Sequence, residues 1–375
     1  MTVYLDCNAT TPIEPRVRDA VLRYMDIEFG NAGSRTHEYG LRAKQAVQRA
    51  REQVAAVVAA SSDEVLFTSG ATESNNLAIL GLAAWGEQNA RRHIISTAIE
   101  HKAVLEPLEE LTRRGFQVDL VRPTAGGWVE PEAVAAKLRP DTLLVSVMHV
   151  NNETGVVQPL REIANALADS SAFLHVDAAQ GFGKNDLIGL PRIDLLSISG
   201  HKIYGPKGVG ALVTRRRKFV RPPLTPLVFG GGQEKGLRPG TLPVPLIVGL
   251  GLAAELAVKE HSARTARCRA FRMAVLETFR NLKAAVNGAE EKSLPHVVNV
   301  SIPGLDSEAA IVAVKDLVAI SNGSACTSQS YEPSHVLIAM GLAEARVRGA
   351  LRLSWCHLTE EVAWNEVRNR LARLM

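Results

Sequence analysis

The residue best placed to do chemistry in this 375-residue sequence is Lys202, in the tetrapeptide Ser199-Gly200-His201-Lys202. The apolar run 193–198 before it predicts a buried strand, and the stretch with glycine and proline after it predicts a turn. A lysine at the end of a core strand can form a Schiff base with an aldehyde, because partial desolvation favours the neutral, nucleophilic amine. A surface lysine after a strand is the alternative, so the other residues of an aldehyde site must decide between the two.

Pyridoxal phosphate, an aldehyde that lysines bind in this way, also needs a place for its phosphate group. The stretch 69–74 lies between an expected strand and an expected helix and consists mainly of small residues. Small residues let backbone N–H groups approach an anion, and the N-terminus of a helix attracts negative charge. Many α/β turns share this composition, and no Gly-Lys pair follows. The stretch therefore indicates an anion site but not a nucleotide-binding P-loop.

Further polar residues follow other expected strands. Asp177 ends an apolar run and would hold a pyridine nitrogen protonated, so that the ring accepts electrons; a structural salt bridge is the alternative. Gln180 or Asn152 would donate a hydrogen bond to the phenolate oxygen of the ring. His101 would stack on the ring, although a lone histidine is more often a helix cap or a core residue. Because all of these residues follow strands, we expect them to share one site.

Such a site needs a scaffold that brings strand ends together. Between residues 64 and 214, apolar runs alternate with amphipathic segments, which predicts repeated strand–helix units. These units build a mostly parallel sheet covered on both faces, with ligands bound beyond the carboxyl ends of the strands. The expected strands are 64–70, 93–97, 117–123, 142–150, 172–179, 193–199 and 208–214, and the first helix between them is expected over 71–86.

The pattern changes after Pro245. A long helical region runs to about Leu282, and shorter strands and helices follow it. We therefore expect an α/β protein with a large domain over 15–250 and a smaller α+β domain made of 1–14 and 251–375. Thr359 is expected to be the N-cap of the last helix, with Glu360 and Glu361 in an acidic first turn.

Composition and charge limit the class of protein. Hydrophobic residues make up 46% of the chain, enough for a large core, and the net charge of +4 is mild. The basic run 215–218 follows a strand and has no interleaved aromatic residues, so we expect no direct nucleic-acid binding. The apolar stretch 242–258 is interrupted by proline and glutamate and predicts no membrane span. The N-terminus lacks the pattern of a secretory signal, which favours a cytoplasmic protein.

The four cysteines are scattered, without a CxxC pair or the spacing of a zinc site. We therefore expect free thiols in a reducing compartment and no metal. Cys326 lies in the small, polar stretch 321–328 after an apolar strand, which indicates a presented thiol rather than a core residue. Cys7, Cys268 and Cys356 are expected to be structural, although Cys7 and Cys356 could lie near the site.

Taken together, these segments resemble the cysteine desulfurases, fold-type I pyridoxal phosphate enzymes of the class V aminotransferase kind. The resemblance extends over nearly the whole chain, and its motifs occur in the order of the family. The matching segments are LDCNATTP, FTSGATESNNLAI, EHKAVL, SVMHVNNETGVVQP, HVDAAQGFGK, SGHKIYGPKGVGAL, GGGQEKGLRPGTLPV and SNGSACTSQSYEPSHVL.

The resemblance implies a role for each matching residue toward pyridoxal phosphate. Lys202 would be the Schiff-base lysine, Asp177 would pair with the pyridine nitrogen, Gln180 would bond the phenolate oxygen and His101 would stack on the ring. The groups implied to hold the phosphate are Ala71, Thr72, Ser199 and His201.

Substrate and partner contacts are implied in the same way. Thr241 would reach the phosphate of a neighbouring subunit, which implies a homodimer. Asn152, also near the cofactor, and Arg352 would bind the carboxylate of L-cysteine, and a bidentate guanidinium suits that group. Cys326 would accept sulfur as a persulfide, with His101 as proton shuttle, and pass it to an acceptor protein.

The sequence does not decide which protein accepts the sulfur. The segments CNATTP, QGFGK and GQEKGLRPGTLPV look most like the desulfurase of bacterial DNA phosphorothioation systems. Iron–sulfur cluster assembly, tRNA thiolation and selenocysteine cleavage are the alternatives on the same fold. A scaffold or DNA-associated protein that uses the fold only for binding is the alternative from a different class.

Overall fold

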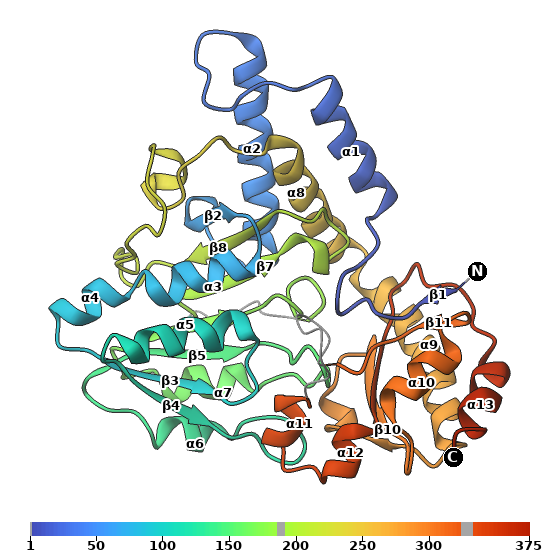
Figure 1. The fold of residues 1–375 in the computed structure, drawn as a ribbon. Coiled ribbons are helices and arrows are strands. Elements are labelled where there is room, and N and C mark those ends of the chain that lie inside the picture. The colour runs from blue at the N-terminus through green and yellow to red at the C-terminus, as the bar shows by residue number, and fades with distance from the viewer. Residues whose placement is uncertain (1, 186–191, 324–332) are drawn as a thin grey trace.

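The computed structural model describes residues 2–185, 192–323 and 333–375. Its centre is a seven-stranded sheet in the order β2-β8-β7-β6-β5-β3-β4 (Figure 1). β8 runs antiparallel to both of its neighbours, and the other adjacent pairs are parallel. This confirms the prediction of a mostly parallel sheet. The strands are β2 (Val65–Thr68), β3 (His93–Thr97), β4 (Gln117–Val121), β5 (Thr142–Met148), β6 (Phe173–Asp177), β7 (Leu195–Ser199) and β8 (Gly210–Thr214).

Helices cover the sheet on both faces. Successive side chains of a strand point to opposite faces, so neighbours in one strand belong to different cores. Ile95 and Leu196 pack in the larger core, whereas Ile94 and Leu195 pack with α3 and α5 on the other face. The helices of this part are α1 (Pro15–Asp26), α2 (Glu38–Val57), α3 (Ala71–Leu80), α4 (Ala83–Gln88), α5 (Lys102–Arg113), α6 (Pro131–Ala135), α7 (Leu160–Ala166) and α8 (Val244–Lys259).

The single helix expected over 71–86 is two helices, α3 and α4. The break follows Leu80, because the carbonyl of Gly81 accepts hydrogen bonds from the backbone N–H and the hydroxyl of Thr225. These bonds come from a loop far along the chain, which local sequence does not reveal.

A second group of elements lies beside the sheet, at the carboxyl ends of its strands (Figure 1). It contains the antiparallel sheet β12-β10-β9 and the parallel pair β1-β11, which brings the N-terminus to residues 318–319. It has its own hydrophobic core. The elements are β1 (Val3–Tyr4), α9 (His261–Arg280), β9 (Ala285–Val286), β10 (Val297–Ser301), α10 (Ser307–Val314), β11 (Val318–Ala319), α11 (His335–Ala339), α12 (Glu344–Arg348), β12 (Ala350–Ser354) and α13 (Trp364–Ala372). Smaller clusters join the two groups, for example Ile99 and Met148 with Val336 and Leu337. The division into 15–250 and 1–14 with 251–375 therefore stays a prediction.

Thr359 does not cap the last helix, so that prediction is wrong. The helix begins five residues later, at Trp364, and Ala363 occupies the cap position. The hydroxyl of Thr359 instead accepts a hydrogen bond from the backbone N–H of Cys356, at 2.9 Å. Within the described ranges, no helix combines the length and the apolar character that crossing a membrane requires.

Candidate active site

The largest group of candidate residues lines one cavity of about 640 Å³ beyond the carboxyl ends of the parallel strands. Polar side chains delivered from several strand ends meet there, as expected for a sheet of this type. The predicted site residues that line it are Ala71, Thr72, His101, Asn152, Asp177, Gln180, Ser199, His201, Lys202 and Arg352. Asn8, Ala9, Thr10, Asn75 and Lys207 line it as well.

Lys202 closes a short 3-10 turn, Gly200–Lys202, directly after β7. Its ammonium nitrogen lies 2.5 Å from the carbonyl oxygen of Asn8 and 2.7 Å from that of Ala9. Both carbonyls belong to the N-terminal arm, residues 5–11, which follows β1. The arm thus fixes the end of the lysine side chain inside the cavity.

Asp177 is the last residue of β6 and is nearly buried. One of its oxygens accepts from the side-chain amide of Asn75 at 2.8 Å, and the other accepts from the backbone N–H of Ala179 at 2.9 Å. These two bonds orient the carboxylate toward the cavity. Gln180 is held through a bond from its amide nitrogen to the carbonyl of Asn8, at 2.9 Å.

The anion site expected over 69–74 lies where β2 leads into α3. Ala71 is the first residue of that ten-residue helix, so the first N–H groups of the helix have no partner within it. Gly210, the first residue of β8, lets the segment 69–74 pack closely against the sheet. A Cβ atom at Gly210 would lie 2.6 Å from the Cα of Gly70, so only glycine fits. Ser199 and His201 line the same cavity, and the His201 ring bonds the hydroxyl of Thr10 at 3.1 Å.

Two histidines in the cavity are held neutral by their surroundings. Burial lowers the pKa of His201 to about 4, and the nearby Lys202 adds to this effect. Burial also lowers the pKa of His101. His101 caps α5, and its Nδ1 accepts from the backbone N–H of Ala103 at 3.0 Å. Since Nδ1 is an acceptor, the neutral ring carries its proton on Nε2, which can donate or relay it.

Arg352 lies on β12 and is 2% exposed, with its guanidinium at the edge of the cavity. It forms an ion pair with Asp6 at 2.7 Å and donates to the carbonyl of Asn152 at 3.2 Å. The side-chain amide of Asn8 donates to that same carbonyl at 3.0 Å. Asn152 and Arg352 therefore lie side by side, as two groups that bind one carboxylate must.

Two predicted site residues are not gathered here. Thr241 is exposed and does not line the cavity. Its contact with a neighbouring subunit stays a prediction. Cys326 lies outside the described residues, so its role also stays a prediction.

Sequence reasoning missed the arm carbonyls and Asn75. Asn75 follows Ala71 by four residues on α3, and this spacing places both on one face of the helix. That signal was available once Ala71 was taken as a phosphate contact. The carbonyls of Asn8 and Ala9 had no such signal, because a backbone group is not visible in residue type.

The residues present suit pyridoxal phosphate. The cavity brings together an amine, a carboxylate 6% exposed and a free helix N-terminus. The side-chain oxygens of Asn8, Asn75 and Gln180 are buried, and within the described part of the chain they have no hydrogen-bond partner. Buried polar atoms without partners are rare in a protein interior, and here they mark room for a polar ligand.

Comparisons with known proteins agree with this geometry. The aminotransferase class-V family model matches residues 3–363. The chain is 48% identical over 354 residues to "Cysteine desulfurase IscS" of Anaeromyxobacter dehalogenans. The alignment covers 93% of this chain and 86% of the relative. Among solved structures, DndA from Streptomyces lividans is 53% identical with a TM-score of 0.81, covering 93% of this chain and 98% of the other. "SspA in complex with cysteine" is 38% identical with a TM-score of 0.82, covering 94% and 98%.

The family match extends over almost all of the chain, including every residue that lines the cavity. The resemblance inferred from the motifs is therefore confirmed. The chain belongs to the aminotransferase class-V family and, within it, to the cysteine desulfurases.

Proposed function

We propose that this protein converts L-cysteine to L-alanine with pyridoxal phosphate and carries the sulfur on Cys326 as a persulfide. The observation that carries this proposal is the cavity in which Lys202, Asp177, His101 and Arg352 meet, in a chain 48% identical to a cysteine desulfurase. When bound, the cofactor supplies an aldehyde for the lysine and a ring that accepts electrons from the substrate.

The residues divide the work of holding the cofactor. Lys202, at the end of β7, would bind the aldehyde, and Asp177, whose position is fixed by Asn75, would hold the pyridine nitrogen protonated. His101 would stack on the ring, and Gln180 would donate to its phenolate oxygen. The groups proposed for the phosphate are Ala71, Thr72, Ser199 and His201.

Other residues act on the substrate. Arg352 and Asn152 bind the carboxylate of L-cysteine and thereby orient its Cα–H bond toward Lys202. Lys202 takes the Cα proton, and His101 relays a proton through Nε2. The Cys326 thiolate attacks the substrate sulfur, the Cβ–S bond breaks, Cβ gains a proton and Lys202 returns a proton to Cα. One cysteine and one thiol thus become one alanine and one persulfide.

We further propose a cytoplasmic homodimer in which Thr241 contacts the cofactor phosphate of the neighbouring subunit. Its exposure in a single chain is compatible with that contact. The sulfur passes to an acceptor protein, and DNA phosphorothioate modification is the proposed pathway. The segments CNATTP, QGFGK and GQEKGLRPGTLPV and the 53% identity to DndA support this pathway over general iron–sulfur assembly.

Alanine and sulfide release from L-cysteine tests the central proposal. The parent protein is expected to release both in the presence of a thiol reductant. Cys326→Ser is expected to retain the visible absorption of the bound cofactor and to lose sulfur release at least 100-fold, because no thiolate remains to attack. Cys268→Ser is the matched control and should keep both activities. A Cys326→Ser variant that still releases both products would refute the assignment of Cys326.

A further inference from the structure

Two of the four cysteines, Cys7 and Cys356, pack around Tyr204 and do not line the candidate active-site cavity. Cys7 and Cys356 are 1% and 3% exposed and pack against each other and Tyr204 in one buried cluster. Neither thiol takes part in the proposed reaction. Two adjacent buried thiols can be oxidised to a disulfide, and this oxidation removes two electrons from the pair.

The backbone brings the pair within reach of a covalent bond. Asp6 and Ser354 form a parallel bridge, and the N–H of Cys7 donates to the carbonyl of Ser354 at 3.0 Å. Bridged strands lie about 4.8 Å apart, and a disulfide needs Cα atoms roughly 4.4–6.8 Å apart. Cys7 and Cys356 follow this bridge by one and two residues, so their Cα atoms fall near that range.

The surroundings of the pair favour a thiolate on one member. The neighbouring Cys7 thiol lowers the pKa of Cys356, and the side chain of Lys184 acts in the same direction. The hydroxyl of Thr359 also donates to this sulfur, at 3.6 Å. A thiolate beside a cation is the reactive form of cysteine.

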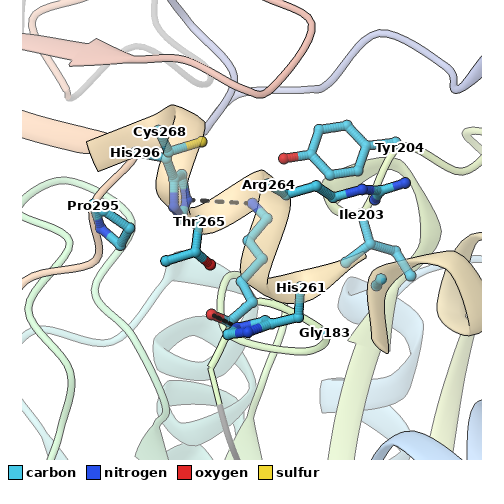
Figure 2. A pocket seen from close by; sticks show the side chains of 11 residues that line it. Gly183, Ile203, Tyr204, His261, Arg264, Thr265, Cys268, Pro295 and His296 are labelled. Carbon is cyan, nitrogen blue, oxygen red and sulfur yellow. Dashed lines mark hydrogen bonds between the residues drawn. The ribbon is translucent and has the colours of Figure 1, made fainter. Parts of the chain in front are cut away.

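A small cavity adjoins the cluster. It has a volume of about 30 Å³, enough for one water-sized molecule, and Tyr204, Cys268 and His296 line it (Figure 2). Lys184 reaches into it and lies 3.4 Å from the His296 ring. Tyr204 is shared by the cavity and the thiol cluster. The cavity therefore meets the pair through Tyr204, although neither Cys7 nor Cys356 lines it.

We propose that Cys7 and Cys356 are a redox modification site, at which a small hydroperoxide joins them in a reversible disulfide. The Cys356 thiolate attacks the peroxide oxygen, the O–O bond breaks, and a sulfenic acid and one water form from hydrogen peroxide. The Cys7 sulfur then displaces the sulfenic oxygen as a second water. Two thiols lose two electrons and two protons, and the peroxide gains them.

The disulfide would act on the reaction site through the backbone. Cys7 precedes Asn8 and Ala9, whose carbonyls hold Lys202, and Cys356 ends the segment that carries Arg352. Joining the sulfurs at about 2.05 Å draws these two segments together. A displacement of about 1 Å in a catalytic site can cost roughly 100-fold in rate. We expect the disulfide to lower the desulfurase rate tenfold or more, and this part rests on the proposed function.

Peptide mapping tests the site independently of activity. The Cys326→Ser protein with its cofactor is treated with hydrogen peroxide and denatured in the presence of an alkylating agent, which blocks the free thiols. It is then digested with trypsin. The expected product is a linkage between peptides 1–16 and 353–368, with free thiols falling from three to one per chain. The linkage should disappear on reduction. It should be absent from Cys7→Ala and Cys356→Ala and present in Cys268→Ser. A folded protein that keeps three thiols, or one that links Cys268 instead, would overturn the proposal.

The rate effect is measured in chains that retain Cys326. The parent and Cys7→Ala receive the same peroxide dose, and each rate is normalised to its untreated value. Oxidation of Cys326 is common to both, so their difference reports the pair alone. The parent should lose at least tenfold more activity than Cys7→Ala. Linkage with equal losses would refute the coupling to the site, and absence of desulfurase activity in both untreated proteins would refute the proposed function instead.

Discussion

Replacing Glu100 by glutamine should stabilise the protein relative to the parent increasingly as pH rises, because Glu100 is fully buried directly before His101. One carboxyl oxygen accepts from the hydroxyl of Thr97 at 2.7 Å and from the backbone N–H of Met148 at 2.8 Å. The other oxygen has no hydrogen-bond partner among the described residues. Burial raises the pKa of Glu100 from 4.5 to about 8, and the charge of Asp177 adds to the rise. The carboxyl is therefore protonated at neutral pH.

The sign of the effect follows from proton binding. Between pH 4.5 and 8 the folded protein keeps the Glu100 proton and the unfolded chain has lost it, so stability falls as pH rises. The slope is about 1.4 kcal/mol per pH unit, which gives about 3 kcal/mol at pH 7 and 4–5 kcal/mol across the window. Glutamine has no proton to lose, and its amide oxygen can accept the same two bonds. The stability of Glu100→Gln relative to the parent should thus increase by about 3 kcal/mol between pH 4.5 and pH 7, whatever constant cost its buried amide donors add.

Urea unfolding of the holoprotein at pH 5, 6, 7 and 8, followed by circular dichroism, measures this term. The difference in unfolding free energy between Glu100→Gln and the parent should grow with pH, because all other titrating groups cancel. Glu260→Gln is a control of opposite sign: hydrogen bonds from Arg16 lower the pKa of Glu260 to about 2, so its loss should destabilise the protein at neutral pH. A Glu100→Gln difference that stays constant from pH 5 to 8 would show that the carboxyl is not held protonated.

Two further predictions concern the cavity. Arg352→Lys should raise KM for L-cysteine about 10- to 100-fold, because lysine cannot give the bidentate, charge-assisted bond; Arg370→Lys, which alters an ion pair with Asp316 outside the cavity, is the control. Equal KM values in the two variants would remove Arg352 from substrate binding. Asp177→Asn should retain the cofactor on Lys202 yet lower alanine formation roughly 100-fold or more, because electrostatic stabilisation of the reacting ring is lost. A rate near that of the parent, with cofactor bound, would contradict the role of Asp177.

Much of the scaffold was predictable, because hydrophobic periodicity locates the strands and the ends of the strands locate the site. Apolar runs identified the strands of the seven-stranded sheet, and the rule that ligands bind at their carboxyl ends gathered His101, Asp177 and Lys202 before the structure did. The break at Gly81 and the late start of the last helix at Trp364 were not predictable. The break at Gly81 depends on bonds from Thr225, far along the chain, which local propensity does not register. The hydroxyl of Thr359 is engaged by the backbone of Cys356 instead of a helix start.

The arm shows most clearly what sequence patterns leave out. The strand before it, β1, pairs with β11, and Cys7 and Asn8 of the arm bond Ser354 at the end of β12. The arm is therefore anchored to the second group of elements. Its carbonyls nevertheless hold Lys202 of the main sheet. A backbone carbonyl has the same chemistry in every residue, so only the fold can assign it a role.

This arrangement has a mechanical consequence. The amine that we propose takes a proton follows β7, whereas the guanidinium that we propose orients the substrate lies on β12. A shift between the two parts of the chain would change the separation of Lys202 and Arg352. The arm opposes such a shift, because it bonds Lys202 through Asn8 and Ala9 and pairs Asp6 with Arg352 at 2.7 Å. The distance between proton acceptor and substrate anchor is therefore set by the arm as much as by the two side chains.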